Sequence, residues 1–215
     1  MDFKVHQFLP NPGYITYKLS NEEMDFVWKK IDQALVDNEN ANAKLAGNIN
    51  KSLDMNMDNI GPFNTKILAL CDEYEKQFGK TYKNQVSVDK RNEIVFNAWW
   101  VNYQFENEFN PQHNHSGIYS WVIWMNIPTE SDDQKNLPIA ANSGSDARIS
   151  NFEFTYTNTL GGIKEHIINM GKAAEGTLCL FPADLKHSVN PFYNCSEPRI
   201  TVAGNISLYT YPKNN

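Results

Sequence analysis

The segments IVFNAWWVNYQF (residues 94–105), GIYSWVIWMNIP (117–128) and RITVAGNISLYTY (199–211) decide the fold. Each is rich in β-branched and aromatic residues and is bounded by turn-forming residues, which is typical of β-strands. Three similar segments are ARISNFEFTYTN (147–158), KEHIINM (164–170) and GTLCLFP (176–182). No helical pattern intervenes among them. Residues 93–215 are therefore predicted to form an antiparallel sandwich or barrel, mainly β, of the double-stranded β-helix (jelly-roll) type.

Residues 1–92 are predicted to support this core with an extended segment (3–19) and two α-helices. Ser20 and Glu23 form a capping-box pattern that begins the first helix, whose apolar residues recur at helical spacing from residue 24 to 35. The second helix carries a similar stripe from residue 67 to 78 and ends at Gly79. The Asn-rich stretch 38–61 and the polar segment 129–147 lack periodicity and predict surface loops. The length of 215 residues predicts a single domain, residues 1–215.

Composition restricts the class of protein. The formal net charge of −6 does not favour nucleic acid as a partner. The three cysteines are odd in number and form no CxxC pair, so neither a disulfide framework nor a zinc knuckle is indicated. No stretch approaches the roughly 20 apolar residues of a membrane span, and no secretory leader is evident. We expect a cytoplasmic protein that acts on a small molecule or a peptide; a homodimer is compatible with the sequence.

The histidines of FNPQHNHSGIYSW (109–121) indicate a metal site. His113 and His115 are two residues apart near a strand end, where the period of two places both imidazoles on one face. His187 follows the strong strand GTLCLFP, which a β-helix would bring beside an earlier strand. Neutral imidazole is a common transition-metal ligand. Spacing alone does not bring His187 to the pair, and surface or core histidines are the alternative.

Arg199 opens the strand RITVAGN twelve residues after His187, and Thr201 points to the same side. An arginine in so apolar a strand offers a planar fork that binds a carboxylate through two hydrogen bonds, and a neighbouring hydroxyl adds a third. The pattern therefore predicts an anchor for a dicarboxylic cosubstrate. An exposed salt bridge is the alternative.

The segments NEFNPQHNHSGIY (107–119) and EGTLCLFPADLKHSVNPFYNCSEPRITVAGNIS (175–207) resemble the 2-oxoglutarate- and Fe(II)-dependent oxygenases common in marine bacteria and their phages. The wider superfamily includes prolyl 4-hydroxylases and uses an H-x-D pair, a distal histidine and a later arginine or lysine. The resemblance implies that His113 and His187 bind iron and that Arg199 binds 2-oxoglutarate. It also implies cosubstrate contacts for Tyr103 and Tyr119, with a packing role in the core as the alternative for both. For a phage-encoded protein, the location would be the host cytoplasm.

His115 departs from the superfamily pattern because it stands where the H-x-D pair has aspartate. A face of three histidines is one arrangement. In another, Asp184 or Glu153 completes the ligand set and His115 orients a ligand from outside it. A vacant position filled by halide is a more distant arrangement.

The resemblance implies a dioxygenase that uses Fe(II), 2-oxoglutarate and O₂, and that hydroxylates a peptide prolyl or small-molecule C–H bond with release of succinate and CO₂. Two other classes fit the same fold, since fold alone does not fix function. One is a non-catalytic jelly-roll module that binds a ligand or protein. The other is a cupin-like metalloenzyme without 2-oxoglutarate, for which Arg199 would have no purpose.

Overall fold

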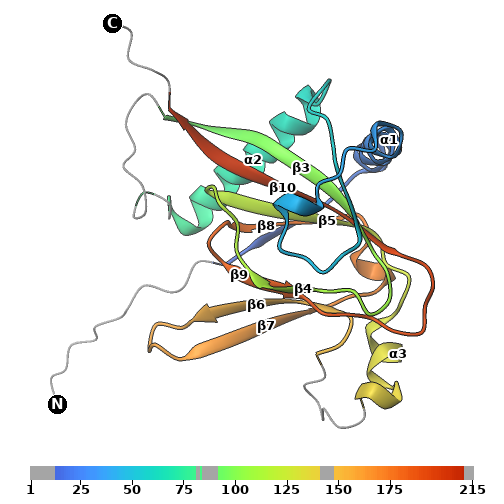
Figure 1. The fold of residues 1–215 in the computed structure, drawn as a ribbon. Helices are drawn as coiled ribbons and strands as arrows, with labels where there is room; N and C mark the ends of the chain where they lie inside the picture. Colours follow the sequence, from blue (N-terminus) through green and yellow to red (C-terminus); the bar gives the residue numbers. More distant parts are fainter. Residues whose placement is uncertain (1–12, 81–82, 84–91, 141–147, 211–215) are drawn as a thin grey trace, which may run out of the picture.

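The computed structural model describes residues 13–80, 83, 92–140 and 148–210, and its strands form two antiparallel sheets (Figure 1). The larger sheet has the order β1-β8-β5-β10-β3-β2 and the smaller one β4-β9-β6-β7. The larger sheet comprises β1 (Ile15–Lys18), β2 (Lys51–Asp54), β3 (Asn92–Gln104), β5 (Tyr119–Asn126), β8 (Thr177–Pro182) and β10 (Arg199–Thr210). The smaller sheet comprises β4 (Asn110–His113), β6 (Asn151–Thr157), β7 (Ile163–Asn169) and β9 (Lys186–Val189).

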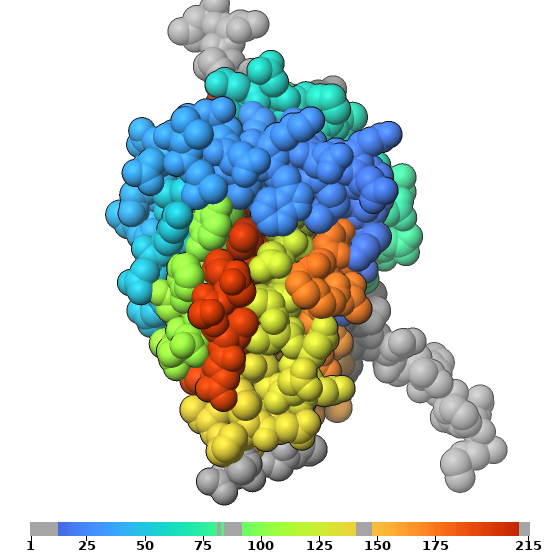
Figure 2. All heavy atoms as spheres, turned by 90° about the vertical axis from the view of Figure 1, so that its right-hand side faces the viewer, coloured from blue at the N-terminus to red at the C-terminus, as the bar shows by residue number. Residues whose placement is uncertain are grey.

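Strands distant in sequence are neighbours in the larger sheet. The C-terminal strand β10 pairs with β3 on one side and with β5 on the other. In Figure 2 the red β10 accordingly lies between the green β3 and the yellow-green β5. These pairings confirm the mainly β prediction.

Two α-helices pack on one face of the larger sheet, as the sequence predicts. Helix α1 (Asn21–Asp37) begins with the expected capping box, in which Ser20 Oγ accepts from Glu23 N–H at 3.2 Å and Ser20 N–H donates to Glu23 Oε2 at 2.8 Å. Helix α2 (Gly61–Phe78) ends at Gly79, whose φ of 77° is the left-handed conformation that glycine adopts without strain. The helices and this face of the sheet share one apolar core.

The two predicted surface loops contain regular structure. The Asn-rich stretch holds a short 3₁₀ helix, η1 (Asn42–Lys44), and strand β2, which adds an edge to the larger sheet. The 129–147 segment holds α3 (Ser131–Lys135) and η3 (Pro138–Ala140), and a third 3₁₀ turn, η5 (Lys172–Ala174), follows β7. Residues 141–147 of the second predicted loop, and residues 1–12 with His6, lie outside the described residues. These elements were missed because they are too short to produce a periodic pattern.

Among the described residues, no helix combines the length and the apolar character needed to cross a lipid bilayer.

Candidate active site

The smaller sheet brings two of the predicted histidines together. Strand β4 pairs antiparallel with β9, and in this register His113 lies directly opposite His187. Because directly opposed residues in an antiparallel pair project their side chains to the same face, the two imidazoles meet, with ring centroids 4.3 Å apart. Sequence spacing could not supply this register, which joins segments more than 70 residues apart.

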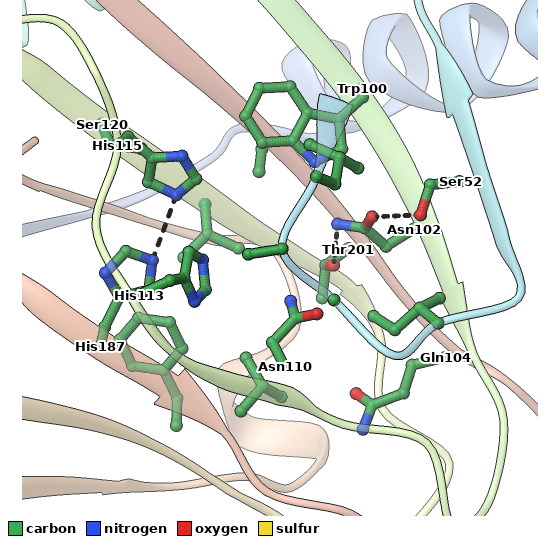
Figure 3. A pocket seen from close by; sticks show the side chains of 18 of the residues that line it. Ser52, Trp100, Asn102, Gln104, Asn110, His113, His115, Ser120, His187 and Thr201 are labelled. Carbon is green, nitrogen blue, oxygen red and sulfur yellow. Dashed lines mark hydrogen bonds between the residues drawn. The ribbon is translucent and has the colours of Figure 1, made fainter. Parts of the chain in front are cut away.

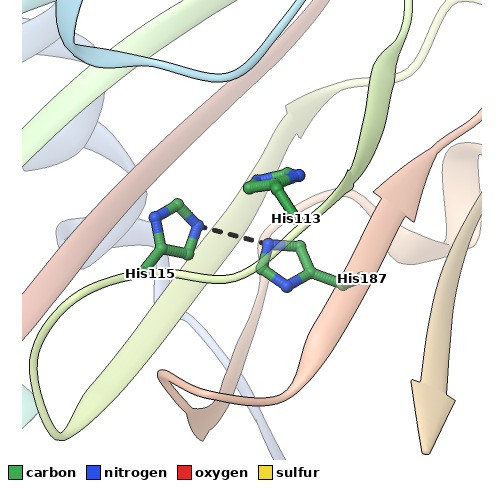
Figure 4. Close-up of side chains that lie close together, drawn as sticks. All are labelled: His113, His115 and His187. Atoms are coloured by element: carbon green, nitrogen blue, oxygen red, sulfur yellow. Dashed lines mark hydrogen bonds between the residues drawn. The ribbon is translucent and has the colours of Figure 1, made fainter.

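His115 joins the pair from the turn after β4. Its backbone N–H donates to the carbonyl oxygen of Ala183 at 2.9 Å, which ties this turn to the segment just before β9. The His115 ring centroid then lies 5.0 Å from those of both His113 and His187. One ligand nitrogen from each of the three residues falls within 4.8 Å of the others, and Figure 4 shows the three rings converging.

Backbone carbonyls orient two of the rings. His113 Nδ1 lies 2.7 Å from Pro111 O, and His187 Nδ1 lies 2.9 Å from Leu185 O. A carbonyl oxygen only accepts, so each Nδ1 carries the proton and each Nε2 keeps its lone pair for a metal ion. The Nε2 atoms of His115 and His187 lie 3.2 Å apart. Two metal–nitrogen bonds of about 2.1 Å meeting at a right angle would set their nitrogens about 3.0 Å apart. This spacing fits two ligands of one ion.

Burial keeps the three imidazoles neutral. Desolvation and, to a smaller extent, the charge of His113 lower the pKa of His187 to about 3 and that of His115 to about 4. Desolvation also lowers the pKa of His113 itself. Neutral imidazole is the form that binds metal, so the site does not need to lose protons before binding at neutral pH.

Neither candidate carboxylate reaches the three histidines. Asp184 is exposed, and Glu153 pairs with Ser188 on β9, so its side chain lies on the opposite face of the smaller sheet from His187. Glu153 instead forms an ion pair with Arg148 at 2.5 Å. Among the described residues, the group suited to hold a metal ion consists of His113, His115 and His187. The geometry therefore favours three histidines over two histidines and one of these carboxylates.

Arg199 lies at the other end of the same pocket and is 1% exposed. Its Nη2 donates to Ser150 Oγ at 2.7 Å and to Ser150 O at 3.1 Å, and its Nη1 donates to Gln104 Oε1 at 3.3 Å. Its Nε has no hydrogen-bond partner among the described residues, and every acceptor that the guanidinium meets there is neutral. Burial lowers the pKa of Arg199 to about 10, so the side chain remains cationic at neutral pH.

A buried cation without an anionic partner is costly, and a bound carboxylate removes that cost. Arg199 and the three histidines line one and the same pocket. A dicarboxylate that binds a metal ion at one end and Arg199 at the other fits this arrangement. Thr201 lines the pocket as predicted and accepts a weak hydrogen bond from Asn102 Nδ2 at 3.4 Å (Figure 3).

Tyr103 and Tyr119 lie beside pocket residues along their strands. Both belong to the apolar core under the helices, and neither lines the pocket. Strand alternation places their neighbours there instead: Asn102 and Gln104 beside Tyr103, and Ser120 beside Tyr119. The cosubstrate contacts expected for both tyrosines remain predictions.

Three residues of the site were not singled out by their sequence. Asn110 lines the pocket beside the histidines, and Ser150 and Gln104 hold Arg199.

Asn110 lay beyond the reach of strand periodicity. A period-two count from His113 would have selected Pro111 rather than Asn110, because the β4 register is irregular between residues 110 and 113. Its place in the pocket follows from this irregularity, which the sequence does not show.

Comparisons with known proteins agree with this geometry. Residues 98–205, half of the chain, match the family described as "Putative 2OG-Fe(II) oxygenase". A prolyl-4-hydroxylase from Pseudomonas putida has a similar structure, with a TM-score of 0.52 and 10% sequence identity over 91% of this chain and 92% of that chain.

A 2OG-Fe(II) oxygenase family oxidoreductase from Burkholderia pseudomallei has a TM-score of 0.47 and 12% identity over 91% of this chain and 84% of that chain. No curated protein has significant sequence similarity to this chain.

The first structural similarity confirms the jelly-roll prediction, and the matched family uses Fe(II), 2-oxoglutarate and O₂. The chain belongs to the 2OG-Fe(II) oxygenase family.

Proposed function

We propose that the protein hydroxylates a C–H bond of a peptide prolyl residue or a small molecule, with His113, His115 and His187 as the iron ligands and Arg199 as the 2-oxoglutarate anchor. The observation that carries this proposal is a single pocket that joins three neutral imidazoles to a buried arginine without a carboxylate partner among the described residues. These are the two attachment points that 2-oxoglutarate needs.

The overall reaction consumes one O₂ and one 2-oxoglutarate for each acceptor. One oxygen atom enters the acceptor as a hydroxyl group and the other enters succinate, while the carboxylate next to the keto group leaves as CO₂. The bound iron supplies oxygen activation, and the protein supplies position and a dry environment. Three neutral ligands leave the positive charge of Fe(II) to be balanced in part by the carboxylate next to the keto group, because Arg199 pairs with the distal carboxylate.

Arg199 contributes a positive charge in a fixed orientation. Ser150 and Gln104 fix two of its nitrogens, so the guanidinium does not have to reorganise when a carboxylate arrives. Phe152 and Val189 line the same pocket and limit the access of water. A cupin-like reaction without 2-oxoglutarate gives this buried cation no task, and neither does a purely structural jelly roll.

The prolyl acceptor is suggested by the Pseudomonas putida neighbour, which is a prolyl-4-hydroxylase. That similarity concerns the fold, so a prolyl residue is the first acceptor to test rather than a conclusion from the pocket.

Anaerobic titration of the purified protein with Fe(II) and 2-oxoglutarate tests the proposal. We expect a visible charge-transfer absorption from the iron–2-oxoglutarate chelate, and its loss in His187→Ala because removal of a ligand weakens metal binding by at least about 100-fold. Ser188→Ala is a matched control on the same strand. Absence of the band in the unaltered protein, or its persistence in His187→Ala, would contradict the proposal.

A further inference from the structure

The pocket has a second wall, formed by the Asn-rich segment that the sequence predicts to be a surface loop. Residues 42–49 contribute Asn42, Leu45, Ala46, Gly47 and Ile49 to the pocket lining. The segment is tied to the strand that carries His113, because Asn48 N–H donates to Phe109 O at 2.9 Å and Asn50 N–H donates to Glu108 Oε1 at 3.1 Å. This wall, here called the 42–49 wall, is therefore held close to the metal end of the pocket.

Among the described residues, the pocket lining offers no charged partner to an acceptor beyond Arg199. Apart from Arg199, the three histidines and the indole N–H groups of tryptophan, every polar residue that lines it is an asparagine, glutamine, serine or threonine. If Arg199 binds 2-oxoglutarate and the histidines bind iron, an acceptor carboxylate finds no cation and an acceptor ammonium finds no anion. Burying either charge without a partner is costly. The lining therefore selects an acceptor that is uncharged where it enters the pocket.

Asn110 is the pocket amide with hydrogen-bonding capacity to spare. The amide of Asn102 is occupied, because its Oδ1 accepts from Ser52 Oγ at 2.7 Å and its Nδ2 donates to Thr201. Gln104 is occupied by Arg199 and by Glu108 O, at 2.6 Å. In contrast, Asn110 Oδ1 is buried without a hydrogen-bond partner among the described residues. Figure 3 shows this amide pointing into the pocket from the strand that carries His113.

Gly47 allows Asn110 to take this position. A Cβ atom at Gly47 would overlap Asn110 Oδ1, which is the far end of a flexible side chain. A methyl group there would displace the amide without forcing the backbone apart. Gly47, in the 42–49 wall, therefore lies against Asn110. A substitution at either of these two residues changes the same part of the pocket.

We propose that Asn110, set by the Gly47 backbone, is a specificity-determining residue that hydrogen-bonds an uncharged amide of the acceptor. This inference rests on the proposed function, since it assigns Arg199 to 2-oxoglutarate. A carboxamide offers one donor and one acceptor side, which pair with the amide groups of a peptide bond or a blocked amino acid. The favoured acceptor is consequently an amide-linked residue rather than the corresponding free amino acid.

Binding of defined small molecules to the anaerobic Fe(II)–2-oxoglutarate protein tests this proposal. The probes are the N-acetyl amides of proline, leucine, isoleucine and valine and the corresponding free amino acids, followed by the change in chelate absorption and in tryptophan fluorescence. We expect at least one acetyl amide to bind about tenfold or more tightly than its free amino acid. We expect Asn110→Ala to weaken that binding about tenfold, because one hydrogen bond to the ligand is lost.

A double-mutant cycle tests whether Gly47 and Asn110 act through the same contact. Gly47→Ala should also weaken acetyl-amide binding about tenfold. The double variant Gly47→Ala/Asn110→Ala should lose no more affinity than the more strongly affected single variant, because both changes remove the same contact. Asn48→Ala is the matched control. Asn48 has the same residue type in the same segment, is exposed and does not line the pocket, so it should bind the probe as the unaltered protein does.

The outcomes separate this proposal from the proposed function. If the chelate absorption fails to form, the proposed function is wrong. If it forms and no acetyl amide binds, if the free amino acids bind equally well, or if Asn110→Ala binds the probe unchanged, the role of Asn110 is overturned while the oxygenase assignment stands.

Discussion

The two faces of the larger sheet use alternating residues of the same strands for different purposes. On β5, Tyr119, Ile123 and Met125 pack in the apolar core beneath α1 and α2. Their neighbours Ser120, Val122 and Trp124 line the pocket. On β3 the same alternation separates Trp99 in the core from Trp100 in the pocket. The helix face stabilises the fold, whereas the pocket face carries the polar and aromatic groups of the site.

On these strands, the face on which a side chain lies decides whether the residue lines the pocket or packs in the core. A shift of one residue moves a side chain from the pocket to the core. Three variants test whether the two faces can be altered separately.

Trp99→Ala should have the largest effect and should act on stability. The side chain is 2% exposed, packs against Phe63 and Phe96, and donates from Nε1 to Asn56 O at 3.1 Å. Loss of a buried tryptophan side chain should lower the free energy of unfolding by about 3–5 kcal/mol. Urea unfolding of the metal-free protein measures this effect. Val36→Ala, at an exposed position of α1, should change it by less than about 0.5 kcal/mol.

Arg199→Gln should have an intermediate effect and should act on cosubstrate binding. Glutamine keeps hydrogen-bonding capacity near Ser150 and Gln104 but removes the cation. Loss of hydrogen bonds to a charged group, worth about 1.5–3 kcal/mol, should raise the Kd for 2-oxoglutarate about 10- to 150-fold. Anaerobic titration measures this Kd, and a separate titration should give an unchanged affinity for Fe(II). A Kd for 2-oxoglutarate close to that of the unaltered protein would remove Arg199 from the anchor role.

Tyr103→Phe should have the smallest effect. The hydroxyl is buried without a hydrogen-bond partner among the described residues, and the ring belongs to the core beneath the helices. Its removal should leave the Kd for 2-oxoglutarate within about twofold and stability equal or slightly higher. The same titration and urea unfolding measure both quantities. A clear loss of 2-oxoglutarate affinity would support the cosubstrate contact that the resemblance implies for Tyr103.

Sequence patterns predicted the elements whose signals are local. The capping box at Ser20, the glycine at the end of α2 and the β-rich segments all lie within a few residues of the structure they determine. His113, His115 and His187 were selected from their strand context and from the family resemblance, and the structure brings all three together with Arg199 in one pocket.

The remaining features depend on contacts that local patterns do not contain. The C-terminal half of β3 and nearly all of β5 are buried on both faces, so hydropathy does not alternate and does not show which face Tyr103 or Tyr119 occupies. The 42–49 wall is polar and aperiodic like any surface loop. Its place in the pocket comes from hydrogen bonds to Glu108 and Phe109, which lie far along the chain from it.

A crystal structure of the protein with Mn(II) and 2-oxoglutarate tests the central assignment most directly, because Mn(II) occupies such sites without the oxidation that Fe(II) undergoes in air. We expect that His113, His115 and His187 all bind the metal and that the distal carboxylate of 2-oxoglutarate contacts Arg199. A metal held by two of these histidines and a carboxylate side chain, or a cosubstrate that does not reach Arg199, would contradict it.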